Sequence, residues 1–600
     1  MANTQTAPLL VPTVRIATVE KSDAAALWVV EPRKKPVRAT ISAPNGHYRV
    51  GDVVAISEHK GSIRVLARLA EAESPKAALY GIAADLGLTP LHSDQVEAEC
   101  VAMTQNLGLD DPNLEDLSRL AFVTIDNEDS RDLDQAMHLR RGDGDSIVIS
   151  YALADGAHYV PVGTSLFEEA LQRGASYYFP GFSIPMLPRL LSEDIVSLNE
   201  DKDRRALVFE MTLSDKARAV TTRVFRARIK SAGKLSYVGV QAYYDAPEGS
   251  ALAGQPYTET LDLLAEVGRL LIDAAKVKDV VRYRRREAEM DLVDGVLTVK
   301  LRPRLEVEMF NEQVSLLCNI EGARLFMERS ANPDLQPIFR VHPAPLQNRL
   351  TELQKFTADL AGVHGLGAEW VWQRDSEGGG ESLADYLERL PDEETTARIR
   401  WAIERQAMLI NERSSFTDTK GPHYGIGAPA YARFSSPMRE IVGIFTHKEA
   451  VELLEGKKLD LTRDLALRDR VIESGNRSKE IQRNIEKRAH KLVLDQLFHS
   501  DLTLPAAQRP RRIGTLMGLD ASRLYVQLDN PPAEIKVYLD HLTTFSENGA
   551  PPAQIITDFA IVLDDARKLT VGDRLSVWVS GYDEGRGKWS FTLVPPPAST

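Results

Sequence analysis

Two strand-rich segments, one toward each end of the chain, limit what this sequence can fold into. Residues 13–72 contain several short runs of β-branched and apolar residues, separated by turn-forming pairs such as Gly51-Asp52. Short strands at roughly ten-residue spacing are typical of a small barrel of the OB or cold-shock type, although any small antiparallel sheet fits the pattern equally well. The stretch 504–512 resembles a linker, and the strand-rich sequence after it predicts a second small barrel.

A long region of mixed pattern lies between these segments. Residues 74–118 contain short helical patterns with glycine-containing turns, which fit either a helix-turn-helix-like element or a helical linker. Residues 119–502 combine strand and helix patterns without a low-complexity break, and this is large for one hydrophobic core. The region is therefore one big domain or two tightly merged ones. The sequence predicts a multidomain α+β chain in four parts, at 1–73, 74–118, 119–502 and 503–600.

Composition narrows the functional classes. Two cysteines, Cys100 and Cys318, are too few for a disulfide framework or a zinc site, and we expect two buried thiols rather than a single bridge. No apolar run approaches the ~18 residues of a membrane helix, and no signal-peptide pattern opens the chain, so we expect a cytoplasmic protein without membrane contact. The net charge of −13 argues on its own against nucleic-acid binding.

Binding depends on local charge, however. Three basic runs could bind phosphates: one along 223–230, one at 282–286 and one at 509–512. Each run taken alone is as easily explained as a solvated surface.

The strongest chemical signal is the acidic stretch TIDNEDSRDLDQAM at residues 124–137. Crowded carboxylates raise one another's pKa unless cations neutralise them. Asp126, Asp132 and Asp134 share parity, so an extended chain would point all three to one face. Oxygen ligands suit a hard cation such as Mg²⁺, which takes a few carboxylates plus substrate phosphate. A solvated acidic loop is the alternative explanation.

Four stretches resemble one known family, in the same order along the chain. AFVTIDNEDSRDLDQAM resembles the signature of the RNase II/RNase R exoribonucleases, the RNB family, and residues 151–211 are similar to the next block. PIFRVHPAP (337–345) and HYGIGAPAYARFSSPMRE (423–440) are similar to the third and fourth blocks. The resemblance implies a large mixed α/β RNB catalytic domain, flanked by small β-barrel (OB-fold) and helical RNA-binding modules. The C-terminal barrel would be of the ribosomal S-one type.

The resemblance also implies an activity and a site. Members hydrolyse single-stranded RNA processively from the 3′ end to nucleoside 5′-monophosphates, and we expect a monomer that uses Mg²⁺, with Mn²⁺ as the alternative ion. Asp126, Asp132 and Asp134 match three of the family's four clustered aspartates, which bind metal and position the attacking water. The fourth falls at Gln135, whose amide oxygen can still bind a metal, but without charge.

Further positions match RNA-contacting residues of the family. Arg439 matches the arginine that grips the scissile phosphate, and together with Asp132 and Asp134 it completes the implied catalytic set. Tyr178 matches an aromatic residue that lines the RNA channel. Tyr237 and Glu312 fall where the family holds the last nucleotide, through base stacking and a hydrogen bond to ribose.

Some positions depart from the family pattern. Ile441 and Gly443 stand where a tyrosine and an aspartate are usual, and residues 288–292 lack the phenylalanine that clamps the terminal base. With Gln135, these departures leave open a catalytically weak or dead RNA-binding protein. The short N-terminal region leaves open a distributive enzyme that trims RNA 3′ ends. His447 matches a family histidine whose role is either structural or functional.

Overall fold

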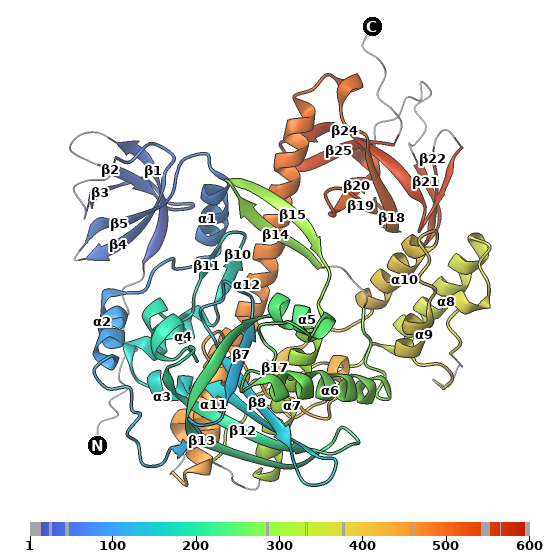
Figure 1. The fold of residues 1–600 in the computed structure, drawn as a ribbon. Helices are drawn as coiled ribbons and strands as arrows, with labels where there is room; N and C mark the ends of the chain where they lie inside the picture. Colours follow the sequence, from blue (N-terminus) through green and yellow to red (C-terminus); the bar gives the residue numbers. More distant parts are fainter. Residues whose placement is uncertain are drawn as a thin grey trace. The chain divides into compact units, whose positions relative to one another are not determined.

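The computed structural model describes residues 14–22, 27–41, 47–59, 61–283, 287–330, 332, 334–374, 379–457, 460–541, 553–563 and 566–593 (Figure 1). The chain divides into two compact units. The first contains 1–275, 304–342 and 414–488, and the second contains 276–303, 343–413 and 489–600. None of the helices in the described ranges is long and apolar enough to cross a membrane.

The first unit begins with a closed five-stranded barrel. Its strands are β1 (Arg15–Ser22), β2 (Leu27–Val30), β3 (Val37–Ile41), β4 (Val53–His59) and β5 (Ser62–Ala70), in the order β1-β2-β3-β5-β4. Alternate residues such as Leu27 and Val29 point into the barrel, where they meet Val54, Ile56 and Val65. The prediction of an OB-like barrel at this end is confirmed over the alternative of another small antiparallel sheet, because the barrel is closed and β3 pairs with β5 in parallel.

Two helices follow the barrel, α1 (Pro75–Asp85) and α2 (Asp94–Met103). Helix α1 packs against β1 and β5 (Figure 1), and α2 packs against α4 (Ser165–Arg173). The buried guanidinium of Arg173 pairs with Glu169 and donates to the backbone carbonyls of Thr89 (2.9 Å) and Leu91 (2.6 Å). The segment that joins the two helices is therefore tied to the central domain by buried charge-assisted hydrogen bonds.

A six-stranded sheet forms the centre of the first unit. Its strands are β6 (Glu115–Asp116), β7 (Phe122–Asp126), β8 (Gln135–Arg141), β9 (Ile147–Ala154), β12 (Asp203–Leu213) and β13 (Ala219–Ser236), in the order β12-β9-β8-β7-β13-β6, and β12 also pairs with β13. Strand β9 is buried throughout. Tyr151 and Leu153 enter one hydrophobic core, whereas Ala152 and Ala154 enter the other, as the two-residue period of a strand requires.

Helices cover both faces of this sheet. The remaining elements of the first unit are α3 (Gly156–Tyr159), β10 (Tyr177–Phe179), β11 (Phe182–Ile184), a π-helix (Leu190–Ile195), α5 (Tyr237–Asp245), α6 (Thr258–Lys276), α7 (Glu306–Glu328), β16 (Phe339–Val341), β17 (Ser415–Thr417), α11 (Ile441–Leu454) and the first part of α12 (Leu461–Leu502). Helix α7 shares the core of Tyr151, and α11 shares the core of Ala152. Cys100 and Cys318 are buried free thiols, as predicted.

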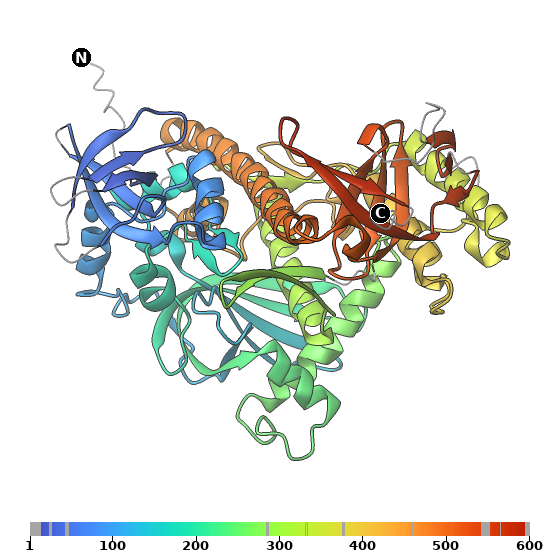
Figure 2. The same cartoon turned by 90° about the horizontal axis from the view of Figure 1, so that it is seen from above.

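The second unit joins C-terminal strands to helices from the middle of the chain. Its elements are β14 (Glu287–Val293), β15 (Val296–Arg302), α8 (Gln347–Val363), α9 (Leu383–Arg389), α10 (Ala397–Leu409), β18 (Arg512–Asp520), β19 (Arg523–Leu528), β20 (Glu534–Tyr538), β21 (Ala553–Thr557), β22 (Ala560–Leu563), β23 (Lys568–Thr570), β24 (Arg574–Asp583) and β25 (Lys588–Thr592). Five of the strands pair in the order β20-β19-β18-β24-β25 and three in the order β21-β22-β23. Leu353 and Ile403 share one core with Val526 and Val577. In Figure 2 the yellow helices from the middle of the chain lie next to the red C-terminal strands, and α10 contacts β18. Residues 343–413 thus belong with the C-terminal strands, whereas their sequence pattern groups them with the central region.

Candidate active site

Two neighbouring strands bring the three predicted aspartates together. Asp126 is the last residue of β7, Asp134 immediately precedes β8, and these strands pair with each other. Asp134 is buried, whereas Asp126 and Asp132 are half-buried. Burial raises the pKa of Asp132, and the nearby carboxylate of Asp126 raises it further. The acidic stretch is therefore a packed cluster of carboxylates and not only a solvated loop.

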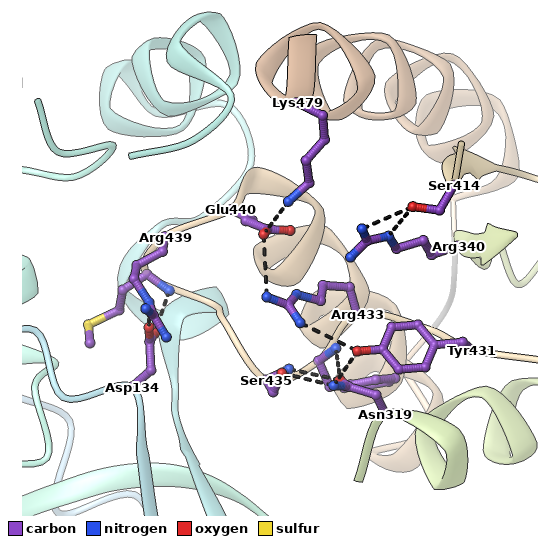
Figure 3. Close-up of polar contacts among 12 residues, drawn as sticks. Asp134, Asn319, Arg340, Ser414, Tyr431, Arg433, Ser435, Arg439, Glu440 and Lys479 are labelled. Carbon is purple, nitrogen blue, oxygen red and sulfur yellow. Dashed lines mark hydrogen bonds and ion pairs between the residues drawn. The ribbon is translucent and has the colours of Figure 1, made fainter. Parts of the chain in front are cut away.

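Asp134 is the anchor of a loop that is distant in the sequence. Its Oδ1 accepts the backbone N–H of Met438 at 2.9 Å, and its Oδ2 accepts the Nε–H of Arg439 at 2.5 Å (Figure 3). Burial raises the pKa of Asp134 to about 6, although Arg439 opposes this shift. Both carboxylate oxygens are thus used to hold the loop and its arginine.

Arg439 keeps one face open. Its side chain is 34% exposed although Asp134 fixes its Nε. Burial acts to lower the pKa of Arg439, but Asp134 and the other two carboxylates of the cluster raise it well above its ordinary value. The guanidinium is therefore charged and oriented, and its remaining donors can bind an anion beside the carboxylates.

Tyr178 stands beside the same charges. Ala175 pairs with Glu440 through a β-bridge, and the N–H of Ser176 donates to the carbonyl of Arg439 at 3.0 Å. This pairing carries β10 past the arginine. Burial raises the pKa of Tyr178 to about 12, Arg439 opposes this shift, and Asp132 and Asp134 raise the pKa further. The tyrosine is 48% exposed, which leaves its ring available to a ligand.

Tyr237 reaches the cluster through the register of the sheet. Ser236, the last residue of β13, pairs with Asp126 in parallel, and Tyr237 then begins α5. Burial raises the pKa of Tyr237 to about 12, and Asp126 contributes. The Nδ2 of Asn311 donates to its hydroxyl at 3.0 Å. Asn311 is a neighbour of the site that the sequence did not single out.

Glu312 is placed differently from the other predicted residues. It is exposed on α7 and forms an ion pair with Arg304 at 2.9 Å. Within the described part of the chain, no hydrogen bond or ion pair joins it to Tyr237 or to the aspartates. The residue of α7 that contacts Tyr237 is Asn311, one position earlier.

Gln135 also has its own partners. As the first residue of β8, it points away from Asp134, because neighbouring residues of a strand face opposite sides. Its amide oxygen accepts the hydroxyl of the buried Tyr151, and its amide nitrogen donates to the backbone carbonyl of Ser435. A carboxylate could accept the first of these bonds but could not donate the second. The position is thus built for an amide.

Buried contacts fix the loop that precedes Arg439. The carbonyl oxygen of the Asn319 side chain accepts the N–H groups of Phe434 (2.7 Å) and Ser435 (3.0 Å), and its Nδ2 donates to the hydroxyls of Tyr431 and Ser435 (Figure 3). The Nε2 of the fully buried His447 lies 2.8 Å from the carbonyl oxygen of Phe434, and burial lowers the pKa of His447 to about 4. A neutral His447 that donates this hydrogen bond is a structural support.

Gly443 lets the same loop approach α11 closely. A Cβ at this position would lie 2.9 Å from the carbonyl oxygen of Ser436 and 3.0 Å from the Cα of Pro437. Both are backbone atoms, so they cannot swing aside as a side chain would. An aspartate cannot fit here unless the loop that carries Arg439 moves.

For the RNA hydrolysis that the family resemblance implies, Gly443→Ala should therefore lower kcat by about 100-fold, the effect of an ångström-scale misplacement of a reacting group. Affinity for RNA should change little, because the charges remain. The matched control is Gly81→Ala in α1, where no heavy atom lies within 4 Å of the added Cβ. Single-turnover cleavage and filter binding measure the two quantities. Unchanged cleavage by Gly443→Ala would show that the loop tolerates the shift.

Of the basic runs that the sequence highlighted, the one on β13 is largely neutralised. On β13, Arg223 pairs with Glu115 and Arg228 pairs with Asp116. Arg512 pairs with Asp501 at 2.8 Å. Residues 284–286 lie outside the described ranges. Arg511 donates only to the hydroxyl of Ser576 at 2.8 Å. The paired arginines of β13 and Arg512 thus leave little free charge for phosphates, whereas Arg511 keeps its charge uncompensated by an ion pair among the described residues.

A second group of acidic residues, remote in sequence from the first, surrounds the ammonium group of a lysine. Among the described residues, carboxylate oxygens of Glu449, Glu452 and Asp464 lie within 4.8 Å of one another. The Nζ of Lys448 lies 2.7 to 2.9 Å from all three. The ammonium group occupies the place that a cation would take, and this group joins α11 to α12.

Comparisons with known proteins agree with this geometry. Residues 114–456 match the RNB domain. The chain is 30% identical to ribonuclease R of Escherichia coli over 341 residues, which are 56% of this chain and 40% of that protein. It is 27% identical to exoribonuclease 2 of Erwinia tasmaniensis over 497 residues, 80% of this chain and 72% of that one.

The fold has a solved counterpart. Mycoplasma genitalium RNase R, in complex with ribose-methylated single-stranded RNA, superposes with a TM-score of 0.77 at 18% identity, over 97% of this chain and 90% of that one. This likeness confirms the predicted architecture, a mixed α/β central domain accompanied by an OB-like barrel. With a match to the RNB domain over more than half of its length, the chain belongs to the RNB domain family.

Proposed function

We propose that this protein is a metal-dependent 3′→5′ exoribonuclease that hydrolyses single-stranded RNA processively to nucleoside 5′-monophosphates. The observation that carries the proposal is the pairing of Arg439 with Asp134, which holds a partly exposed guanidinium beside two further carboxylates. Such a site can bind a phosphate from one side and a cation from the other. The names of the relatives support the same activity.

Asp126 and Asp132 would hold the metal. Their carboxylates are half-buried beside Arg439, and Oδ1 of Asp126 accepts the N–H of the adjacent Asn127 at 2.7 Å. Both oxygens of Asp134 and both polar atoms of the Gln135 amide have partners from distant parts of the chain. Mg²⁺ is commonly bound by one or two carboxylates together with substrate phosphate, so the two available groups fit it, and Mn²⁺ suits the same oxygens. When bound, the ion would lower the pKa of a water and stabilise charge on the leaving oxygen.

The protein's own groups would position the RNA. The free donors of Arg439 would grip the scissile phosphate and favour the charge that develops on it. Tyr178 and Tyr237 would stack on bases without reading them, which suits a sequence-independent nuclease. The N-terminal barrel and the C-terminal strands would bind RNA further along the RNA strand. We also propose that the protein acts as a cytoplasmic monomer.

A comparison of linear and circular RNA tests this function. The protein should degrade a linear single-stranded RNA and leave a covalently closed circle of the same sequence intact, since an exonuclease needs an end. Cleavage of the circle would indicate an endonuclease and would overturn the proposal. Tight binding of both RNAs without cleavage would favour the RNA-binding alternative, which the neutral Gln135 motivates.

Tyr178 should limit how short the RNA can become. We expect Tyr178→Ala to lengthen the limiting 5′ product by one or more nucleotides, because a lost stacking contact of about 1–3 kcal/mol weakens the grip on short chains. Tyr178→Phe is the control and should keep the original product length. Denaturing gels of 5′-labelled RNA measure this. An unchanged product in Tyr178→Ala would remove the ring from the RNA path.

A further inference from the structure

Three basic side chains surround a single carboxylate on the far side of the Arg439 loop (Figure 3). The Nζ of Lys479, on α12, donates to Glu440 Oε1 at 2.7 Å, and the Nη2 of Arg433 donates to the same oxygen at 3.4 Å. Arg340, on β16, donates its Nε and Nη2 to the hydroxyl of Ser414 at 3.1 and 3.0 Å. Arg340 makes no ion pair with any carboxylate of the described residues.

The cluster carries an excess of positive charge. Burial lowers the pKa of Lys479, Glu440 opposes this shift, and the neighbouring Arg433 and Arg340 lower the pKa further. Burial raises the pKa of Glu440, but the adjacent cations outweigh this and bring it to about 2. Glu440 is therefore ionised, yet its one charge faces three cations. Like charges held together where water is partly excluded raise the free energy of the folded protein unless an anion binds among them.

The cluster also has unused donors and an opening. The Nε of Arg433 is buried and has no acceptor among the described residues, and its Nη1 reaches only the hydroxyl of Tyr431 at 3.4 Å. The side chains of Arg433 and Lys479 are 23% and 33% exposed, so a ligand can reach them. The paired arginines of β13 differ, because Arg223 already has Glu115 as its partner.

We propose that Arg340, Arg433 and Lys479 form a second phosphate-binding site, adjacent to the one that Arg439 serves. The proposal rests on the proposed function and extends it. The ligand is a phosphate group of RNA chemistry, either a backbone phosphodiester of the bound strand or the 5′-phosphate of a released nucleotide. Glu440 weakens this site by offsetting one of the three charges, which lets a phosphate leave as the strand advances.

Salt dependence of RNA binding tests the site directly. Binding of single-stranded RNA is measured in an Asp134→Asn background and in EDTA, so that cleavage is slow on the time scale of the measurement. Lys479→Gln and Arg433→Gln should each weaken binding and reduce the slope of log affinity against log salt by about 0.7, the loss of one phosphate contact on a single strand. Arg223→Gln is the matched control and should leave the slope unchanged.

The Glu440→Gln variant distinguishes a phosphate-binding role of the cluster from a purely structural one. If the cluster binds phosphate, removal of the opposing charge should strengthen RNA binding several-fold. If Lys479 and Glu440 only brace the Arg439 loop, Glu440→Gln should lower the melting temperature and cleavage without strengthening binding, which overturns the proposal. Lys479→Arg keeps the charge and should restore the salt slope, so that a folding defect in Lys479→Gln can be recognised.

Competition by a nucleoside 5′-monophosphate distinguishes the two sources of phosphate. If Lys479→Gln abolishes the inhibition of RNA binding by the nucleotide, the site binds the released nucleotide. If this inhibition is unaltered while the salt slope is reduced, the site binds the backbone of the RNA strand. If the variants fold and keep the parental salt slope and RNA affinity, and the parent protein cleaves RNA, the proposal of a second phosphate site is wrong. A parent protein that neither binds nor cleaves RNA would instead overturn the proposed function.

Discussion

Asp134→Asn is expected to reduce kcat for RNA cleavage by about 10²–10³ and to change RNA affinity by less than a few-fold. The carboxylate holds the Nε of Arg439 and the N–H of Met438, and an amide cannot provide the same charge to both donors. The guanidinium would then lose its orientation toward the phosphate, and the loss of one oriented donor is typically of this size. Single-turnover cleavage and filter binding give the two values.

The control for this variant is Asp129→Asn, at an exposed position of the same acidic stretch. It changes the charge by the same amount and should leave kcat within two-fold, on the order of an ordinary surface substitution. Turnover retained by Asp134→Asn would show that the ion pair with Arg439 does not control the chemistry. A loss of RNA affinity with kcat unchanged would show that Asp134 acts only through binding.

Arg439→Ala should have an effect of at least similar size, about 10³ in kcat, because it removes the guanidinium itself. It also leaves the buried Asp134 without its counter-charge, so the melting temperature should fall. Arg439→Lys is the conservative variant. It keeps the charge but cannot offer two parallel donors, and we expect only partial recovery.

Steady-state kinetics distinguish the role of Arg439 from simple binding. The loss should appear in kcat, with KM changed by less than ten-fold, if the arginine acts on the phosphate that reacts. Equal losses in kcat/KM and in affinity, with kcat unchanged, would assign Arg439 to ground-state binding. Full activity in Arg439→Lys would show that a point charge is sufficient.

The sequence predicted what depends on local pattern. Short apolar and β-branched runs separated by turn-forming pairs predicted the N-terminal barrel, and the parity of Asp126, Asp132 and Asp134 predicted that these residues would gather. The structure places them at the adjoining ends of β7 and β8. The aspartates therefore meet because a loop at 127–134 joins two paired strands, and not through the two-residue period of one extended strand.

Other features depend on long-range contacts that no local pattern encodes. Whether Gln135 faces a metal or the core is decided by Tyr151 and Ser435, the latter 300 residues away in the sequence. The basic run on β13 attracts attention in the sequence, yet acids from 115–116 neutralise it. The cluster of Arg340 and Lys479 left no local signal, because its members come from separate elements.

The most direct test of the proposed function is the fate of a 5′-labelled single-stranded RNA incubated with the purified protein, in Mg²⁺ and separately in EDTA. A processive 3′→5′ exoribonuclease should convert the RNA in Mg²⁺ to a short 5′ oligonucleotide without long intermediates, and EDTA should prevent this. That result would also show that chemistry proceeds with Gln135 in place of a fourth carboxylate. RNA that stays intact in Mg²⁺, or is shortened equally in EDTA, would contradict a metal-dependent exoribonuclease.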